Sequence, residues 1–458
     1  LVIGSGPSGQ KAAIQAAKLG KRAAVVEQRG RIGGVSIHTG TIPSKTLREA
    51  VRDELARRPL DVPDPMHPEY DERAAIDFLR ERTARVVSAE TGVVREQFRR
   101  NGVGVLLGLA EFVDEHSVRV RDEDTAQEFS AANIVIAVGT RPARPPGVQF
   151  DDRAIIDSDG LLNLEHRVPR TMTVVGAGVI GVEFASIFGA LGTKVTLVDQ
   201  RPQLMSFLDG EISEALQYIM RRENVTFRLG EKVASVESRE GGAVTHLQSG
   251  KVIASEAVLY ATGRQGCTED LALEKAGLSS DKRGRIHVDQ DFRTEVPHIF
   301  AVGDVAGPPG LAATAMEQGR LATLHAFEQP VRSLPELIPT GIYAIPEVSM
   351  VGRTEEDLTE AAVPYVAGVA RWREMARGLM TGDEDGMLKL LVSPAEGQVL
   401  GVHVLGTGAT DLVHIGQAVM GCGGTIEFLL SAVFNYPTFA ESYKIAALDA
   451  MNRAALGP

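Results

Sequence analysis

The chain has 458 residues, enough for about three domains of roughly 150 residues each. Apolar residues make up 44% and charged residues 24%, a composition typical of a folded globular protein that excludes a largely disordered chain. The net charge of −12 argues against partners such as nucleic acid or a membrane surface. Cys267 and Cys422 are the two cysteines, so we expect no disulfide framework, no metal site and a reducing, cytoplasmic location.

An internal repeat organises the first half of the chain. Residues 1–29 align without a gap with residues 173–201, and each copy predicts a strand, a G-x-G-x-x-G turn, a helix and a second strand ending in an acid. The turn glycines are Gly4, Gly6 and Gly9 in the first copy and Gly176, Gly178 and Gly181 in the second, and the acids are Glu27 and Asp199.

This pattern is the dinucleotide-binding fingerprint. The turn brings backbone N–H groups to a pyrophosphate at the helix N-terminus, and the acid accepts hydrogen bonds from a ribose. Two copies predict two dinucleotides, as expected for a flavin and a nicotinamide nucleotide that exchange hydride. The most membrane-like stretch, residues 172–191, lies in the second copy. Because it contains Glu183 and several glycines, we expect a buried strand and a close-packed helix there.

The segments outside the repeat differ in composition. Residues 57–72 are rich in Pro and Asp and predict an exposed loop, which precedes a surface helix at 74–100. Prolines at 141–146 and 329–339 mark predicted domain boundaries. Beyond the second boundary, mixed strands and helices indicate an α+β domain. Its predicted strands lie at 342–351, 387–392 and 399–404, and its predicted helices at 411–421 and 441–455.

Further motifs resemble those of a known family. A strand at 299–304 ends in Gly303-Asp304 and precedes an Ala-rich helix, and strand-end motifs occur at 137–139 and 261–263. In this order the motifs resemble the pyridine nucleotide-disulfide oxidoreductase flavoproteins over essentially the whole chain. The resemblance implies an α/β fold with two Rossmann-like dinucleotide-binding domains, for FAD and NAD(P), and a C-terminal α+β domain that forms a homodimer. The implied bounds are 1–147 and 265–334 for the FAD-binding domain, 148–264 for the NAD(P)-binding domain and 335–458 for the dimerisation domain.

The fingerprints and the resemblance together give the expected binding residues. Those expected at FAD are Gly4, Ser5, Gly6, Pro7, Ser8, Gly9, Glu27, Gln28, Gly33, Gly34, Ser36, Thr41, Lys45, Ala110, Ala137, Gly139, Asp304 and Ala312. Those expected at the substrates NAD(H) and NADP(H) are Gly176, Gly178, Val179, Ile180, Gly181, Glu183, Asp199, Arg201 and Gly263.

Lys45 and Glu183 are the expected catalytic pair. The resemblance places Lys45 near flavin N5 and pairs it with Glu183 beside the nicotinamide, where the two would position the ring and tune the flavin. A purely structural ion pair is the alternative. Asp199 favours a free ribose 2′-OH, whereas Arg201 suits a 2′-phosphate. Arg201 is equally interpreted as a plain surface arginine, because Arg29 holds the matching place in the FAD copy, where no such phosphate exists.

The sequence departs from the family's disulfide reductases at the positions that handle thiols. Those enzymes carry two cysteines, separated by four residues, where this chain has Ser36 and Thr41, and a His where this chain has Tyr436. Hydroxyl groups cannot form a disulfide, and a phenol with a pKa near ~10 is a poor base at neutral pH. We therefore do not expect thiol–disulfide exchange.

Segments at 40–45, 339–343 and 435–438 resemble the energy-independent, Si-specific pyridine nucleotide transhydrogenase branch of the family. This resemblance implies FAD-dependent transfer of hydride between NADPH and NAD⁺ in a ping-pong cycle, with both nucleotides using the Gly176 site in turn. Three alternatives stay open: a diaphorase or quinone reductase built from the same residues, a flavoprotein that binds nucleotides without useful turnover, and a disulfide reductase.

Overall fold

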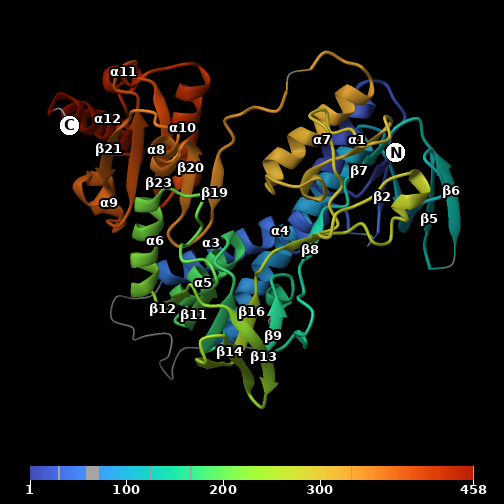
Figure 1. Cartoon of the computed structure of the whole chain (residues 1–458), viewed down its shortest axis with the longest axis horizontal. Helices are drawn as coiled ribbons and strands as arrows, with labels where there is room; N and C mark the ends of the chain where they lie inside the picture. Colours follow the sequence, from blue (N-terminus) through green and yellow to red (C-terminus); the bar gives the residue numbers. More distant parts are fainter. Residues whose placement is uncertain (29–30, 58–71, 124, 164–167, 332, 457–458) are drawn as a thin grey trace.

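The computed structural model covers the whole chain and describes all residues except 29–30, 58–71, 124, 164–167, 332 and 457–458. Most of the predicted loop at 57–72, and Arg29, therefore lie outside the described residues. The described part is built on three five-stranded sheets. The N-terminus lies at one side of the molecule and the C-terminus at the other (Figure 1).

The first sheet is parallel throughout and holds the first copy of the repeat. Its order is β18-β7-β1-β2-β3, with β1 (Val2–Ile3), β2 (Ala24–Glu27), β3 (Gly104–Leu107), β7 (Ile134–Ile136) and β18 (Ile299–Ala301). Ile299 on β18 pairs with Ile134 on β7, so a late segment of the chain returns to complete this sheet. Helix α1 (Pro7–Lys18) follows β1, and α7 (Ala312–Ala326) packs against α1.

The second sheet holds the second copy and is also parallel. Its order is β12-β11-β10-β16-β9, with β9 (Ile155–Asp157), β10 (Thr171–Val175), β11 (Lys194–Asp199), β12 (Val225–Leu229) and β16 (Ala257–Tyr260). Helices α5 (Val179–Ala190) and α6 (Gly210–Arg222) belong to this unit, and most of α5 is buried. Residues 172–191 thus form a strand and a buried helix. Among the described residues, no helix is long and apolar enough to cross a membrane.

Antiparallel strands connect and flank the two parallel sheets. β8 (Thr140–Pro142) pairs with β17 (Arg264–Gly266), where the chain leaves the first sheet and where it returns. Two three-stranded sheets, β4-β5-β6 and β13-β14-β15, are added outside the repeat. Their strands are β4 (Leu109–Phe112), β5 (Ser117–Arg121), β6 (Ala126–Ser130), β13 (Val233–Arg239), β14 (Gly242–Leu247) and β15 (Val252–Ser255).

The third five-stranded sheet is antiparallel and lies in the C-terminal part. Its order is β19-β20-β23-β22-β21, with β19 (Thr340–Ile342), β20 (Val348–Gly352), β21 (Val366–Arg371), β22 (Met387–Val392) and β23 (Val399–Leu405). The accompanying helices are α8 (Glu355–Glu360), α9 (Ala376–Thr381), α10 (Ala409–Gly421), α11 (Ile426–Ser431) and α12 (Ser442–Leu456). The buried Trp372 stacks on Phe439 with ring centroids 3.8 Å apart, which fixes the start of α12 against the sheet.

Three helices after β2 link these units. They are α2 (Gly34–His38), α3 (Thr41–Arg57) and α4 (Glu72–Arg100). Ala50 and Val51 on α3 are fully buried in one hydrophobic core with Leu197 of the second sheet and Ile342 of the third. Helix α3, which follows the first copy of the repeat, is thus packed against the second and third sheets; Figure 1 shows it between these units.

Candidate nucleotide sites and the junction between them

The first glycine of each fingerprint adopts a backbone conformation that other residues rarely reach. Gly4 has φ of +103°, and a Cβ there would lie 2.4 Å from Ala137 O. Gly176 has φ of +110°, and its Cβ would lie 2.5 Å from Ala261 O. Both turns therefore require glycine for the same two reasons, as the sequence repeat predicts.

The second glycine of each fingerprint faces open space. A Cβ built on Gly6 or on Gly178 would meet no described protein atom within 4 Å. These residues cap the N-termini of α1 and α5, and neither helix has a side-chain cap for its first N–H groups. Uncapped N–H groups beside an open glycine fit the pyrophosphate of a dinucleotide. The residues present therefore fit a dinucleotide in both copies.

The acid of the first copy ties the turn to the segment that follows β2. Glu27 is buried, and its Oε2 accepts hydrogen bonds from the Ser5 N–H (3.2 Å) and from the Ser5 hydroxyl. Ser5 Oγ in turn accepts from the Gly33 N–H at 2.9 Å. Ser8 on α1 reaches Val302 O at 3.5 Å, next to the Gly-Asp motif. The expected FAD residues on β1, α1, β2 and α2 are thus neighbours.

Asp304 is positioned by the strands that cross between the sheets. Its Oδ2 accepts from the Thr140 hydroxyl at 3.0 Å, and Arg264 Nε lies 3.9 Å from the same oxygen. Arg264 also donates to Thr140 Oγ1 and to Thr140 O, both at 2.7 Å. Asp304 stays one-third exposed, so its carboxylate is held in place and accessible. The sequence motifs gave no sign of Thr140 or Arg264, because their contacts join segments 124 residues apart.

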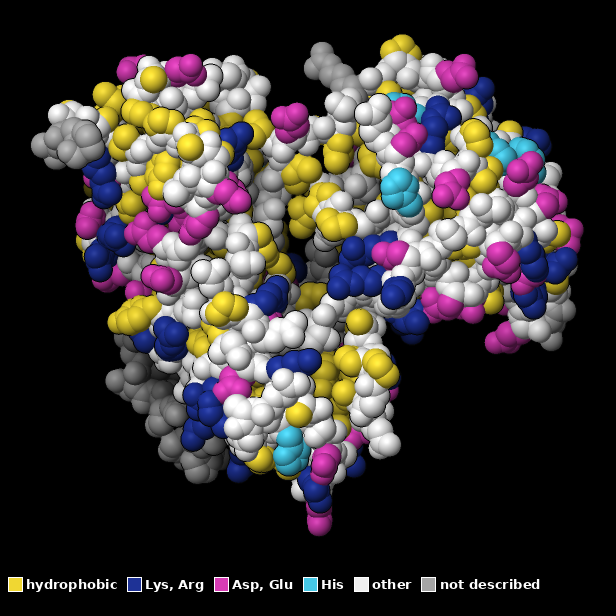
Figure 2. All heavy atoms as spheres, in the orientation of Figure 1, with side chains coloured by type: hydrophobic (Ala, Val, Ile, Leu, Met, Phe, Trp, Pro, Cys, Tyr) yellow, Lys and Arg dark blue, Asp and Glu magenta, His cyan; other side chains and the backbone are white. Residues whose placement is uncertain are grey.

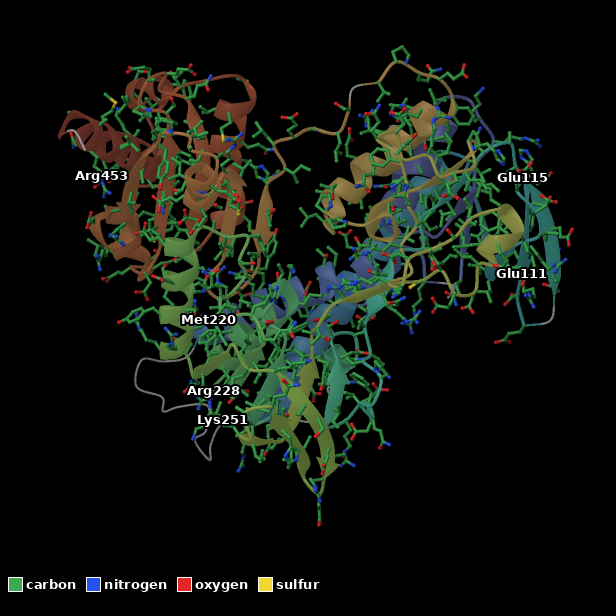
Figure 3. The ribbon with its side chains drawn as sticks, in the orientation of Figure 1. Glu111, Glu115, Met220, Arg228, Lys251 and Arg453 are labelled. Atoms are coloured by element: carbon green, nitrogen blue, oxygen red, sulfur yellow. The ribbon has the colours of Figure 1, made fainter. Side chains whose placement is uncertain are left out.

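Other expected FAD residues lie at different depths. Ala137 and Ala110 are buried, and Ala110 packs in a core with Ile3 and Val26. The neighbouring Glu111, labelled in Figure 3, makes ion pairs with Arg119 (3.0 Å), Arg121 and Lys275 (3.4 Å). The expected FAD residues with partly or fully accessible surface include Pro7, Gln28, Gly34, Gly139 and Ala312, and those expected at the nicotinamide nucleotides include Val179, Ile180 and Gly263.

Lys45 and Glu183 meet at the junction between the two copies. Lys45 Nζ on α3 donates to both Glu183 carboxylate oxygens on α5, at 2.8 and 2.6 Å. The Glu183 side chain is 5% exposed and that of Lys45 is 23% exposed, so the pair is largely removed from water. The structure therefore brings together the two residues that the sequence had paired.

Tyr343 completes this junction from the C-terminal part. Its backbone N–H donates to Glu183 Oε1 at 2.9 Å, and its ring lies 5.0 Å from Lys45 Nζ. Burial raises the pKa of the Tyr343 phenol, which stays neutral at physiological pH. Sequence reasoning placed Tyr343 within a family motif without giving it a role. Each of the three units therefore contributes one residue to the junction.

The positions of the family's redox cysteines hold hydroxyl groups. The Ser36 hydroxyl on α2 donates to Gly33 O at 3.2 Å, and Thr41 is exposed at the start of α3. His38 Nε2 lies 3.0 Å from Ile32 O, so this ring is engaged with the backbone. Cys267 follows β17 and Cys422 follows α10, away from the α2–α3 segment in the sequence. Within the described residues, no group of three His, Cys, Asp or Glu side chains could hold a metal ion.

The acid of the second copy carries a bidentate ion pair. Asp199 is buried, and it accepts from the Ala177 N–H (2.6 Å), the Arg201 N–H (2.8 Å), Arg201 Nε (3.0 Å) and Arg201 Nη2 (2.8 Å). Burial opposes ionisation of Asp199, but the hydrogen bonds from Arg201 and Ala177 outweigh it and lower the pKa of this carboxyl. The same contacts raise the pKa of Arg201. Both groups are charged at neutral pH.

Comparison with known proteins identifies the family. The family model for pyridine nucleotide-disulphide oxidoreductases matches residues 1–319, and its dimerisation-domain model matches residues 338–447. The chain belongs to the pyridine nucleotide-disulphide oxidoreductase family. It is an oxidoreductase, and this family implies the use of flavin and pyridine nucleotide. The predicted α/β fold with a C-terminal dimerisation domain is confirmed.

Curated relatives and solved structures cover nearly the whole chain. A soluble pyridine nucleotide transhydrogenase of Mycobacterium bovis is 54% identical over 99% of this chain and 97% of its own length. A protein of the same name from Chromohalobacter salexigens is 44% identical, covering 99% and 98%. The HOCl-induced flavoprotein disulfide reductase RclA from Escherichia coli, as its Cu(II) complex, superimposes with a TM-score of 0.88 at 28% identity, covering 98% of each chain. LpdA from Mycobacterium tuberculosis gives a TM-score of 0.88 at 25% identity, also covering 98% of each chain.

Proposed function

We propose that this chain is an FAD-dependent transhydrogenase that passes hydride between NADPH and NAD⁺ in a ping-pong cycle. One observation carries the proposal: Ser36 and Thr41 stand where the disulfide reductases of the family carry their two redox cysteines. The Lys45–Glu183 ion pair, which joins α3 to α5, supports it. FAD, when bound, supplies a ring that accepts hydride from one nucleotide and returns it to another. The names of the relatives at 54% and 44% identity support the same activity.

Different residues of the chain would bind FAD, bind the nicotinamide nucleotide and orient the nicotinamide ring. The α1 N-terminus and Gly6 would hold the FAD pyrophosphate, Glu27 a ribose and Asp304 a further hydroxyl of the cofactor. The α5 N-terminus would hold each nicotinamide nucleotide in turn. Lys45 and Glu183 would sit between the two ligands and keep one orientation for the incoming ring. Their burial limits access of water to the reacting groups.

The test compares hydride acceptors with the FAD-loaded protein. NADPH should reduce a thio-analogue of NAD⁺ rapidly, and thiol reagents should not change this rate. Reduction of a disulfide substrate should stay at background. Slow transfer to the analogue combined with fast turnover of a quinone would overturn the proposal in favour of a quinone reductase. Nucleotide binding without transfer to either acceptor would favour a flavoprotein that binds nucleotides without turnover.

We also propose that the protein is cytoplasmic and forms a homodimer, and the match to a dimerisation domain supports the homodimer. Figure 2 shows hydrophobic side chains exposed over the C-terminal part of the molecule. The exposed large hydrophobic residues of this part are, among others, Phe428 on α11, Val433 after it, and Leu448 and Met451 on α12, and Val433 is 95% exposed. Apolar surface of this kind suits contact with a second copy. The molar mass of the FAD-loaded protein in solution should be about twice 49.0 kDa, and a monomer would contradict the proposal.

A further inference from the structure

All of the hydrogen-bond acceptor positions of the Asp199 carboxylate are occupied. A carboxylate offers about four lone-pair positions. Oδ1 accepts the Arg201 N–H and Nε–H, and Oδ2 accepts the Ala177 N–H and Arg201 Nη2–H. A ribose 2′-OH that needs Asp199 as its acceptor can bind only after the guanidinium has moved. Arg201 therefore controls the residue that would recognise a nucleotide without a 2′-phosphate.

The two copies of the repeat differ at this point. In the first copy the turn residue Ser5 donates both its N–H and its hydroxyl to Glu27. In the second copy the matching residue is Ala177, which has an N–H and no hydroxyl, and the guanidinium of Arg201 takes the additional place on the acid. The guanidinium of Arg201 thus donates to the second acid, whereas the hydroxyl of Ser5 donates to the first.

Arg201 is able to move and to take a second ligand. Its side chain is 48% exposed, so the guanidinium can move out into solvent, whereas the Asp199 side chain is 6% exposed and, once released, needs a replacement donor such as the ribose 2′-OH. A guanidinium has five N–H donors, and the hydrogen bonds of this one to the described residues use Nε and Nη2 on Asp199. The Nη1 donors and one Nη2 donor are left for a phosphate, which arginine binds in the same forked geometry as a carboxylate.

We propose that Arg201 is a movable counter-ion that allows one site to accept both NADP(H) and NAD(H). With NADP(H), the guanidinium stays on Asp199, neutralises it and donates its remaining N–H groups to the 2′-phosphate. With NAD(H), it leaves, and the ribose 2′-OH donates to the acceptor positions that it vacates. The inference rests on the proposed function, because a transhydrogenase must take both nucleotides at one site.

Equilibrium binding of NADP⁺ and NAD⁺ to the FAD-loaded protein tests the assignment. Arg201→Gln should raise the dissociation constant for NADP⁺ by about 10- to 100-fold, because a charge-assisted hydrogen bond is lost and the phosphate faces an uncompensated carboxylate. The dissociation constant for NAD⁺ should stay level or fall, because Asp199 is freed. Adding Asp199→Asn to this variant should restore part of the NADP⁺ affinity and weaken NAD⁺ binding.

A matched control lies in the same unit of the chain. Arg239 donates to Glu237 at 2.5 Å, also two residues away and exposed, so Arg239→Gln should change neither dissociation constant. Equal weakening of both nucleotides by Arg201→Gln, or weakening of NAD⁺ alone, would overturn the inference. Each nucleotide is measured alone, so this result does not depend on hydride transfer. Wild-type protein that binds both nucleotides but transfers no hydride would instead overturn the proposed function.

Discussion

Glu183 is the residue on which the junction depends. Its carboxylate is nearly inaccessible to water, and it is compensated by the Lys45 ammonium and the Tyr343 N–H. Removing one partner of a buried ion pair leaves a charge without compensation, which is far costlier than replacing both partners with neutral groups. This asymmetry separates a structural role of the pair from a role in hydride transfer.

Lys45→Met should lower the free energy of unfolding by about 3 kcal/mol, because Glu183 would stay buried with one hydrogen bond. Lys45→Met combined with Glu183→Gln should recover most of this loss, since the Gln side chain is neutral and still offers an acceptor to Tyr343. Urea unfolding of the FAD-loaded variants measures both changes. A double variant as unstable as the single one would contradict this account of the pair.

The same double variant tests the catalytic role. If the charges orient the nicotinamide, hydride transfer in the double variant should fall by about 10²-fold even though stability is regained. Lys45→Arg, which keeps the charge, should retain more of the rate. Transfer at the wild-type rate in a stable double variant would leave the pair with a structural role alone.

Single residues differ in how far the sequence could predict them. Lys45 and Glu183 lie in motifs, so a resemblance was sufficient to pair them. Tyr343 could not be assigned a contact, because its N–H reaches Glu183 across 160 residues of chain and no local pattern encodes that approach. The pairing of Arg201 with Asp199 was also missed. It needs the side-chain conformation, whereas the sequence showed only that the two residues are two positions apart.

At the scale of elements, the turn of each β-α-β unit contains one glycine that folding requires and another that nucleotide binding requires. A Cβ on Gly181 would lie 1.9 Å from Gly176 O, whereas one on Gly178 would meet no described protein atom within 4 Å. The two glycines are three residues apart in one turn. Adding a methyl group to each therefore tests two different functions of the same element.

Gly178→Ala should leave thermal stability and FAD content unchanged and raise the dissociation constants for both NADP⁺ and NAD⁺ by at least ~10-fold, or about 1.4 kcal/mol. The reason is that the methyl group would occupy the space in front of the α5 N-terminus. Gly181→Ala is the matched control and should destabilise the fold by about 1–3 kcal/mol through overpacking. Wild-type nucleotide binding by Gly178→Ala would show that no pyrophosphate lies there.

Elements of the repeat were predictable because their signal is local and occurs twice. The strands and helices of both copies match the structure closely, since turn glycines, apolar strands and terminal acids stand at fixed spacing. The hairpin sheets were not predicted. β5 and β14 do alternate between buried and more exposed residues, but each is five or six residues long and nothing in the sequence names its pairing partner.

At the scale of the whole molecule, a buried lysine joins the second unit to the C-terminal sheet. Lys389 on β22 has a side chain that is 1% exposed, and its Nζ lies 2.8 Å from Asp209, 3.2 Å from Glu211 and 3.0 Å from Glu355. Asp209 caps α6 of the second unit, whereas Glu355 begins α8 of the C-terminal part. The order of units along the chain was predictable from motifs, but this contact between them depends on tertiary packing.

The pKa shifts give this cluster a defined pH range. Burial opposes ionisation of Asp209, yet Lys389 outweighs it and lowers the pKa of this carboxyl. Burial likewise disfavours the Lys389 ammonium, but Asp209 and Glu355 raise its pKa. Asp209, whose pKa is lowered in the folded protein, stabilises the fold at pH values above its unfolded pKa near ~3.9. This stabilisation is lost as the pH falls through the folded pKa. Lys389, whose pKa is raised, stabilises the fold at pH values below its unfolded pKa near ~10.4. This stabilisation is lost as the pH rises through the folded pKa.

Lys389→Met should therefore lower the free energy of unfolding by about 3–5 kcal/mol near neutral pH, because Asp209 would remain fully buried without its cation. The difference from wild type should shrink as pH falls toward about 4, because Asp209 without its cation takes up a proton at a higher pH than in wild type, where Lys389 lowers the pKa of this carboxyl. Arg222→Gln is the matched control: Arg222 on α6 pairs with Asp385 just before β22 at 2.9 Å, so it joins the same two units at the surface. Both of these side chains are about half exposed, and the loss should stay below about 1 kcal/mol. Thermal unfolding of both variants from pH 4 to 9 measures the contrast, and equal losses would show that burial does not decide the strength of this connection.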